Sequence, residues 1–132
     1  MKKLIPFLLA VLVLAGCSST AKGEAKNTYR QVTAKEAASL METEENYIIL
    51  DVRTETEYAE RHIPNAVCIP NETIGTSEIP QLPDKGQLIL VYCRSGNRSK
   101  QAASKLAALG YTNVVEFGGI NGWTGETVSG KG

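Results

Sequence analysis

Short apolar runs alternate with longer amphipathic stretches along the middle of the chain. Runs typical of strands, most of them covered on both faces, lie at residues 47–50, 66–69, 88–92 and 112–117. Helices are expected where capping residues stand or where apolar residues recur every three or four positions, at residues 33–41, 54–61 and 99–109. Strands separated by helices of this length predict a small α/β domain with a largely parallel sheet over residues 29–124.

The amino-terminal end of the chain follows a different pattern. Lys2 and Lys3 precede an apolar run that ends in small residues, so residues 1–16 are interpreted as a secretory signal. The run is shorter than the roughly 20 apolar residues that a membrane-spanning helix needs. Residues 14–17, Leu-Ala-Gly-Cys, resemble a bacterial lipobox. The resemblance implies cleavage before Cys17, a diacylglycerol on that cysteine, and an extracytoplasmic location at a bacterial membrane.

The segments that flank the domain are small and polar. Residues 17–28 begin at the lipidated cysteine and lack apolar periodicity, which is typical of a flexible tether. The glycine-rich residues 125–132 have too few apolar side chains to pack, and they are predicted to form a flexible tail. The folded unit is expected to be a monomer, and the lipid anchor is expected to hold it at the membrane.

Composition limits the partners and cofactors that the chain is expected to have. With 132 residues it has room for one domain, and a hydrophobic content of 42% is ordinary for a globular protein. Lysine plus arginine equals aspartate plus glutamate at 14 each, so the charge does not indicate a nucleic-acid partner. Neither a metal site nor a cofactor is expected, because the sequence lacks Cys/His spacings and motifs typical of them.

Cys93 stands where a nucleophile would be expected. It follows the strand at 88–92, precedes a helix and opens a loop of small, polar and cationic residues. Arg94 and Arg98 supply positive charge and the helix start supplies unpaired N–H groups, and both features lower the pKa of a nearby thiol. Gly96 readily adopts a positive φ, which would let backbone N–H groups converge on one anion. The negatively charged outer sulfur of a persulfide would suit such a nest.

Four segments, in order, resemble a single-domain rhodanese: Asp51–Tyr58, His62–Ala66, Cys93–Ser99 and Gly118–Trp123. The resemblance implies a five-stranded, mostly parallel sheet with helices on both faces, and Cys93 as the sulfur acceptor. In that family the cysteine takes the outer sulfur of thiosulfate or another donor and passes the resulting persulfide sulfur to cyanide or a thiol. The residues expected to cradle the sulfur are Arg94, Ser95, Gly96, Asn97, Arg98 and Ser99.

Alternative functions stay open beside sulfur transfer. Related phosphatases and arsenate reductases carry a Cys-x5-Arg loop, whereas Cys93 and Arg98 form a Cys-x4-Arg loop, whose closer N–H groups suit a single sulfur atom. Rhodanese-like domains without the cysteine serve as binding or regulatory modules, and the presence of Cys93 argues against that function here. A persulfide carrier that receives its sulfur from a dedicated partner is a further alternative.

The remaining polar and sulfur-bearing residues near these motifs are expected to be structural. Asp51 and Arg53 could pair with each other or with Glu57 and are interpreted as scaffold, with Arg53 a secondary candidate at the pocket rim. Cys68 lies in an apolar run and is interpreted as a packing residue rather than a resolving thiol. His62, the only histidine, is expected to hold a turn rather than to act as a base.

Overall fold

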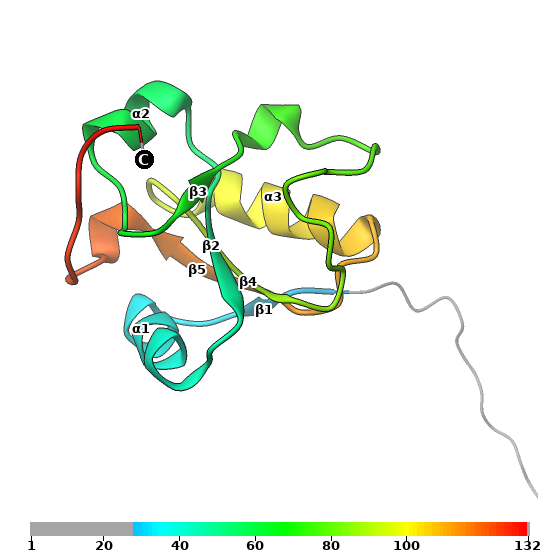
Figure 1. Ribbon diagram of the computed structural model, residues 1–132, viewed down its shortest axis with the longest axis horizontal. Coiled ribbons are helices and arrows are strands. Elements are labelled where there is room, and N and C mark those ends of the chain that lie inside the picture. Colours follow the sequence, from blue (N-terminus) through cyan, green and yellow to red (C-terminus); the bar gives the residue numbers. More distant parts are fainter. Residues whose placement is uncertain (1–27, 132) are drawn as a thin grey trace, which may run out of the picture.

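A central parallel sheet organises the chain (Figure 1). The computed structural model describes residues 28–131, so the expected signal at 1–16, the lipidation site Cys17 and the tether up to residue 27 lie outside the described residues. Five strands pair in the order β1-β5-β4-β2-β3, and every pair is parallel. They are β1 (Arg30–Gln31), β2 (Tyr47–Asp51), β3 (Val67–Cys68), β4 (Leu88–Cys93) and β5 (Val114–Gly119). The expected α/β fold is confirmed.

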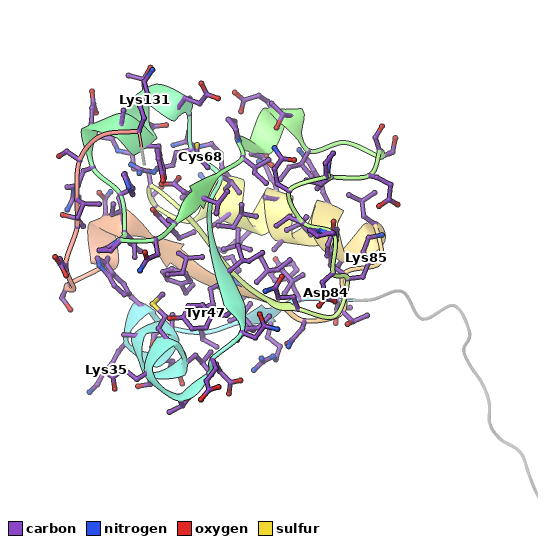
Figure 2. All side chains as sticks on the ribbon, viewed as in Figure 1. Lys35, Tyr47, Cys68, Asp84, Lys85 and Lys131 are labelled. Atoms are coloured by element: carbon purple, nitrogen blue, oxygen red, sulfur yellow. The ribbon has the colours of Figure 1, made fainter. Side chains whose placement is uncertain are left out.

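Helices cover both faces of the sheet, as expected. They are α1 (Ala34–Thr43), α2 (Glu55–Glu60) and α3 (Asn97–Ala108), with the 3-10 turns η1 (Asn71–Thr73) and η2 (Ile120–Gly122). Helices α1 and α2 pack with Leu90 and Tyr92 on one face, whereas α3 packs with Ile89 and Val91 on the other. Figure 2 shows side chains filling both sides, and the Tyr47 hydroxyl donates a hydrogen bond to a carbonyl of α1.

Two capping boxes begin the helices on the α1/α2 face. The Thr33 hydroxyl accepts from the Glu36 N–H at 3.0 Å, and the Glu36 carboxylate accepts from the Thr33 N–H at 2.8 Å. Thr54 and Glu57 make the same reciprocal pair, at 3.1 and 3.0 Å. Each box satisfies two N–H groups that would otherwise lack partners at the start of a helix. The second box also fixes Glu57 in the first turn of α2.

Strand β4 is the centre of the sheet, and all six of its residues are buried. It pairs with β2 on one side and with β5 on the other. Because the carboxyl ends of parallel strands share one edge of the sheet, the chain leaves β4 at the edge where ligands bind in such folds. Cys93, the last residue of β4, therefore lies at that edge together with Asp51, the last residue of β2.

The segment at 66–69 differs from the strand that its apolar run predicts. Only Val67 and Cys68 pair with β2, and they form the edge of the sheet. The Val67 side chain is 39% exposed, while Ala66 and Ile69 on either side of the strand are buried. An edge strand pairs with a neighbour on one side only, but its sequence can still be apolar. The apolar run at 66–69 therefore does not show whether the strand lies at the edge of the sheet or is buried on both faces.

The carboxyl-terminal residues also differ from the flexible tail that their composition predicts. Val128 and His62 exchange two backbone hydrogen bonds of 2.8 Å each, and the Gly130 N–H donates to the Ala59 carbonyl at 2.8 Å. The Ser129 hydroxyl donates to the Glu60 carbonyl at 3.0 Å. Backbone pairing with α2 and the turn after it thus holds this segment, although it carries few apolar side chains.

A buried polar network joins the ends of β2 and β4. The Asp51 carboxylate, which is fully buried, accepts from the Arg53 guanidinium at 2.6 Å and from the Tyr92 hydroxyl at 2.6 Å. The Tyr92 hydroxyl in turn accepts from the Ile63 N–H, and the Arg53 guanidinium donates to the Arg61 carbonyl at 2.6 Å. Asp51 and Arg53 thus pair with each other, and their predicted scaffold role stays an interpretation.

Loss of the buried Asp51 carboxylate is expected to destabilise the fold strongly. Asp51→Ala removes the ionic partner of the Arg53 guanidinium. The Arg53 side chain is only 6% exposed, so water cannot replace that partner. Breaking a buried ion pair from one side costs about 3–5 kcal/mol. Urea denaturation should show a loss of this size in the free energy of unfolding, against less than about 0.5 kcal/mol for Glu45→Ala at an exposed position. Equal losses in the two variants would contradict the network.

Candidate active site

The candidate site is the turn that connects β4 to α3. Cys93 ends β4 with 1% of its surface exposed, and α3 begins at Asn97. Gly96 lies between them with a φ of 117°, in a region that glycine enters without penalty. This conformation turns the chain sharply, so that the backbone curls around the cysteine side chain.

The Cys93 sulfur lies among hydrogen-bonding groups of its own loop. The Gly96 N–H donates to Cys93 Sγ at 3.0 Å. The Ser99 hydroxyl oxygen, from the first turn of α3, lies 3.4 Å from the same sulfur. Of the residues that the sequence predicts as a cradle, Gly96 and Ser99 are buried against the sulfur, whereas the side chains of Arg94, Ser95 and Asn97 are exposed. The cradle is thus largely made of backbone.

Hydrogen bonds lower the pKa of the Cys93 thiol. Burial acts in the opposite direction and would raise this pKa by itself. It is outweighed by hydrogen bonds from the Ser99 side chain and from the backbone N–H groups of Ser99, Gly96 and Ser95. Because these groups stabilise the thiolate, a larger fraction of Cys93 is nucleophilic at neutral pH than of an ordinary cysteine.

A pair of glycines at the end of β5 supports the loop from behind. The backbone of Gly119 passes so close to the loop that a Cβ built there would lie 2.0 Å from the Arg94 carbonyl oxygen. The preceding Gly118 has a φ of 90°. The Asn121 N–H then donates to the Arg94 carbonyl at 3.1 Å. Only glycine fits at position 119 without displacing the loop.

The two loop arginines face an acidic partner. The Arg98 guanidinium makes two hydrogen bonds with the Glu57 carboxylate, at 2.8 and 3.1 Å, and Arg94 lies 3.7 Å from the same carboxylate. The Arg98 contact, assisted by Thr54 and opposed by burial, lowers the pKa of Glu57 from 4.5 to about 2. The sequence predicts that the arginines lower the thiol pKa, but hydrogen bonds from the loop contribute more.

A polar cavity of about 150 Å³ lies beside the loop. It is lined by Arg53, Glu57, Glu60, Arg61, Arg94, Ile120 and Asn121. Three of these side chains are arginines and two are glutamates, so the lining carries both charges, and Arg94 directly follows Cys93. Arg53 lines this cavity while it pairs with Asp51. Cys93 is not among the lining residues, so the place of Arg53 at the rim of the Cys93 pocket stays a prediction.

The sequence of the described domain matches a known family. Residues 33–126 match the rhodanese-like domain. The chain belongs to the rhodanese-like domain family. Residues 1–18 match the prokaryotic membrane lipoprotein lipid attachment site, as the lipobox predicts. Within residues 28–131, no helix of this rhodanese-like chain is long and apolar enough to cross a membrane.

Several relatives of this rhodanese-like domain are named for sulfur transfer. The chain is 35% identical over 71 residues to "Thiosulfate sulfurtransferase PspE" of Escherichia coli, a match that covers 54% of this chain and 68% of PspE. It is 40% identical over 82 residues to "Sulfurtransferase" of Allochromatium vinosum, covering 60% and 73%. The solved structure "rhodanese with anions from E. coli" superposes with a TM-score of 0.59 at 32% identity, covering 64% and 99%.

His62 packs away from the chemistry of the rhodanese-like loop. Its ring stacks on Tyr58 with a centroid distance of 3.7 Å, and Nδ1 lies 2.7 Å from the Tyr58 carbonyl oxygen. Its backbone pairs with Val128. The side chain is buried, and these contacts are consistent with the structural role that the sequence predicts.

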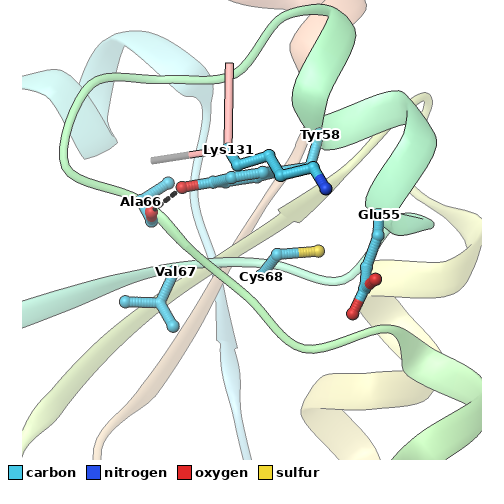
Figure 3. Close-up of a pocket in the computed structure, with 6 residues that line it drawn as sticks. All are labelled: Glu55, Tyr58, Ala66, Val67, Cys68 and Lys131. Atoms are coloured by element: carbon cyan, nitrogen blue, oxygen red, sulfur yellow. Dashed lines mark hydrogen bonds between the residues drawn. The ribbon is translucent and has the colours of Figure 1, made fainter. Parts of the chain in front are cut away.

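Cys68 lies in a second cavity, of about 460 Å³, which Figure 3 shows between α2 and β3. The Cys68 thiol donates to the Arg53 carbonyl at 3.6 Å. Burial, with a smaller contribution from Asp51, raises the pKa of this thiol to about 11. A raised pKa favours the protonated thiol at neutral pH, and Cys68 is not joined to Cys93 by a disulfide, so its packing role stays a prediction.

One polar residue of the site was missed by the sequence patterns. Glu116 lies in the middle of β5, is 2% exposed and accepts a hydrogen bond of 2.5 Å from the Ser99 hydroxyl. The available signal was an acidic residue inside the apolar run at 112–117, where a charge is costly to bury. Among residues 28–131 the structure contains no group of three or more His, Cys, Asp or Glu side chains arranged to hold a metal ion.

The lowered pKa of Glu57 predicts how the stability contributed by its ion pair with Arg98 changes with pH. A carboxylate whose pKa is lowered by folding contributes stability above its unfolded pKa, and that stability is lost as the pH falls through the folded pKa. Urea denaturation should therefore find Glu57→Gln less stable than the wild type at pH 7, with the difference disappearing between pH 4.5 and about 2. A difference that stayed constant over this range would show that the charge of Glu57 is not what stabilises the loop.

Proposed function

We propose that the protein is a sulfurtransferase in which Cys93 accepts a sulfane sulfur and passes it on. The observation that carries this proposal is the short contact between the Gly96 N–H and Cys93 Sγ, made inside a loop closed around the sulfur. A loop of N–H groups stabilises a thiolate, and it would also stabilise the negative outer sulfur of a persulfide. Sulfur transfer in named relatives supports the same chemistry.

Thiosulfate is the donor that the surroundings of Cys93 favour. The Cys93 thiolate attacks the outer sulfur of thiosulfate, a new S–S bond forms, and the old S–S bond breaks with its electron pair leaving on sulfite. An acceptor such as cyanide or a thiolate then attacks the outer sulfur, and the electron pair returns to Cys93. The adjacent cavity is lined by Glu57 and Glu60 as well as three arginines, and Arg61 is the lining arginine that takes part in no ion pair among residues 28–131, so Arg61 could bind an anionic donor. One relative is named as a thiosulfate sulfurtransferase.

The size of the loop argues against phosphate or arsenate chemistry. The loop from Cys93 to Arg98 has only four residues between its cysteine and its arginine. The Arg98 guanidinium, which would have to bind the oxyanion, makes two hydrogen bonds with Glu57 instead. A persulfide needs space for one sulfur atom, whereas a tetrahedral oxyanion needs a wider ring of donors.

Intact-mass measurement after incubation with thiosulfate tests this proposal. The full-length chain in detergent should gain the mass of one sulfur atom, and Cys93→Ser should gain none because the nucleophile is missing. Cys68→Ser is the matched control and should still gain the sulfur, since the Cys68 thiol is protonated at neutral pH. Cyanide should then remove the added sulfur as thiocyanate.

Other results of that experiment would identify an alternative function. A wild-type chain that stays unmodified by thiosulfate, yet gains sulfur from a small-molecule persulfide, would overturn thiosulfate as the donor and favour the persulfide carrier. Hydrolysis of an aryl phosphate that is lost in Cys93→Ser would overturn sulfur transfer in favour of a phosphatase. No gain of sulfur from either donor would overturn the role of Cys93 altogether.

We also propose that Cys17 carries the lipid and that the domain works outside the cytoplasm. The match of residues 1–18 to a lipid attachment site supports this location. Each buried CH₂ of an acyl chain adds about 0.8 kcal/mol of membrane affinity, so two or more chains would hold the protein firmly. Thiosulfate and small thiols would then reach Cys93 from the extracytoplasmic side.

Metabolic labelling in a bacterial host tests the anchor. The wild type should incorporate labelled fatty acid and sediment with the membranes, because the thioether at Cys17 holds the lipid. Cys17→Ser should lose the label and leave the membrane fraction, whereas Cys68→Ser should keep both properties. Equal labelling of Cys17→Ser and the wild type would place the lipid on another residue.

A further inference from the structure

Glu116 is a buried acid without a cationic partner among residues 28–131. Its side chain points to the same face of the sheet as Val114, towards α3, while Val115 and Phe117 point to the opposite face. Its surface is 2% exposed, and none of the ion pairs in the described part of the chain includes it. A charge in such a place is costly unless hydrogen bonds or a shared proton compensate for it.

Hydrogen-bond donors surround the Glu116 carboxylate instead. Its Oε2 accepts from the Ser99 hydroxyl at 2.5 Å and from the Gly118 N–H at 2.9 Å, and its Oε1 accepts from the Gln31 amide at 3.3 Å. Ser99 is also the residue whose hydroxyl lies 3.4 Å from Cys93 Sγ. The carboxylate and the sulfur are therefore linked through one hydroxyl group.

The Ser99 hydroxyl has a single hydrogen, and four acceptors lie around it. They are Glu116 Oε2, the carbonyl oxygens of Gly96 at 3.0 Å and Gly118 at 3.2 Å, and Cys93 Sγ. Carbonyl oxygens only accept, so they supply no proton to this set. When the hydrogen of Ser99 points to the carboxylate, the Cys93 thiol donates to Ser99. When it points to a Cys93 thiolate, the contact between Ser99 and Glu116 is a hydrogen bond only if Glu116 carries a proton.

We propose that Cys93 and Glu116 share one proton through Ser99, so that the proton of the Cys93 thiol is stored on Glu116 when the thiolate forms. This inference rests on the proposed nucleophilic role of Cys93 and adds a positioning residue to it. The S–H bond of Cys93 breaks, Ser99 takes that proton and gives its own to Glu116 Oε2. The net charge of the three groups is unchanged, and the loop keeps the thiolate.

The charged groups nearest to this relay point elsewhere. From α3, Arg98 faces Glu57 and the Lys105 ammonium donates to Asn71. Lys100 on the same helix and Arg30 on β1 are exposed to solvent. From β4, Tyr92 lies on the opposite face of the sheet and directs its hydroxyl to Asp51. Arg94, which follows Cys93, is exposed and faces Glu57 as well. Arg98 also interacts electrostatically with Cys93, so its charge shifts the midpoints of the shared titration without contacting Ser99.

The pH dependence of Cys93 alkylation tests the shared proton without requiring sulfur transfer. The full-length chain in detergent is treated with iodoacetamide over a range of pH, and the rate at Cys93 is followed by peptide mass spectrometry. Two coupled groups titrate in two macroscopic steps. The wild-type rate should rise in two steps, with a plateau where the proton is shared, and Glu116→Gln should reduce the profile to one step.

Three variants separate the relay from a simple structural effect. Ser99→Ala keeps Glu116 but removes the linking hydroxyl, so its profile should also have one step, whereas Ser99→Thr should restore two. Glu57→Gln removes a negative charge near the loop without touching Ser99, so both steps should remain even if their midpoints move. Ser99→Ala also serves as the test if Glu116→Gln does not fold.

Infrared difference spectra provide the second measurement. Alkylation of Cys93 removes the thiolate and so removes the reason for Glu116 to hold a proton. The carboxylic-acid C=O band should therefore decrease on alkylation of the wild type, and no such change should occur in Glu116→Gln. A wild-type alkylation profile with a single step would overturn the shared proton. So would a carboxylic-acid C=O band whose intensity does not change when Cys93 is alkylated. Either result would leave the proposed persulfide at Cys93 unaffected, because the intact-mass measurement with thiosulfate tests that proposal separately.

Discussion

The hydrogen bond from the Gly96 N–H to the Cys93 sulfur depends on a chain that turns within three residues of a buried strand. Strand β4 is covered on both faces and holds Cys93 still, so the turn has to be made by the residues that follow. Gly96 makes it with a positive φ, Gly119 lets the backbone of β5 approach the loop closely, and the Asn121 N–H donates to the Arg94 carbonyl. The site is thus a property of backbone packing more than of its exposed side chains.

The groups that stabilise the Cys93 thiolate differ from the charged groups around the loop. Hydrogen bonds from Ser99, Gly96 and Ser95 act directly on the sulfur and lower the pKa of the thiol. Arg94 and Arg98 instead contact Glu57, and Arg94 also lines the neighbouring cavity. A strong cation held against the sulfur would stabilise the thiolate further but would also lower its nucleophilicity.

Sequence patterns predicted the elements that depend on local signals. The capping residues at Thr33, the apolar run of β4 and the Cys93 loop all have physical causes within a few neighbouring positions. The paired segment at 128–130 depends on hydrogen bonds to residues far along the chain, and no local pattern encodes that. Glu116 was visible as an acid in an apolar run, but its link to Cys93 depends on the register of β4, β5 and α3.

The loop around Cys93 has the size for one additional sulfur atom, and a crystal structure of the protein after treatment with thiosulfate would show whether it holds one. We expect a second sulfur bonded to Cys93 Sγ, lying inside the turn within hydrogen-bonding distance of the loop N–H groups, with the backbone from Arg94 to Ser99 unchanged. A second sulfur directed away from the loop, or a loop that opens to accommodate it, would show that the turn is not a persulfide site.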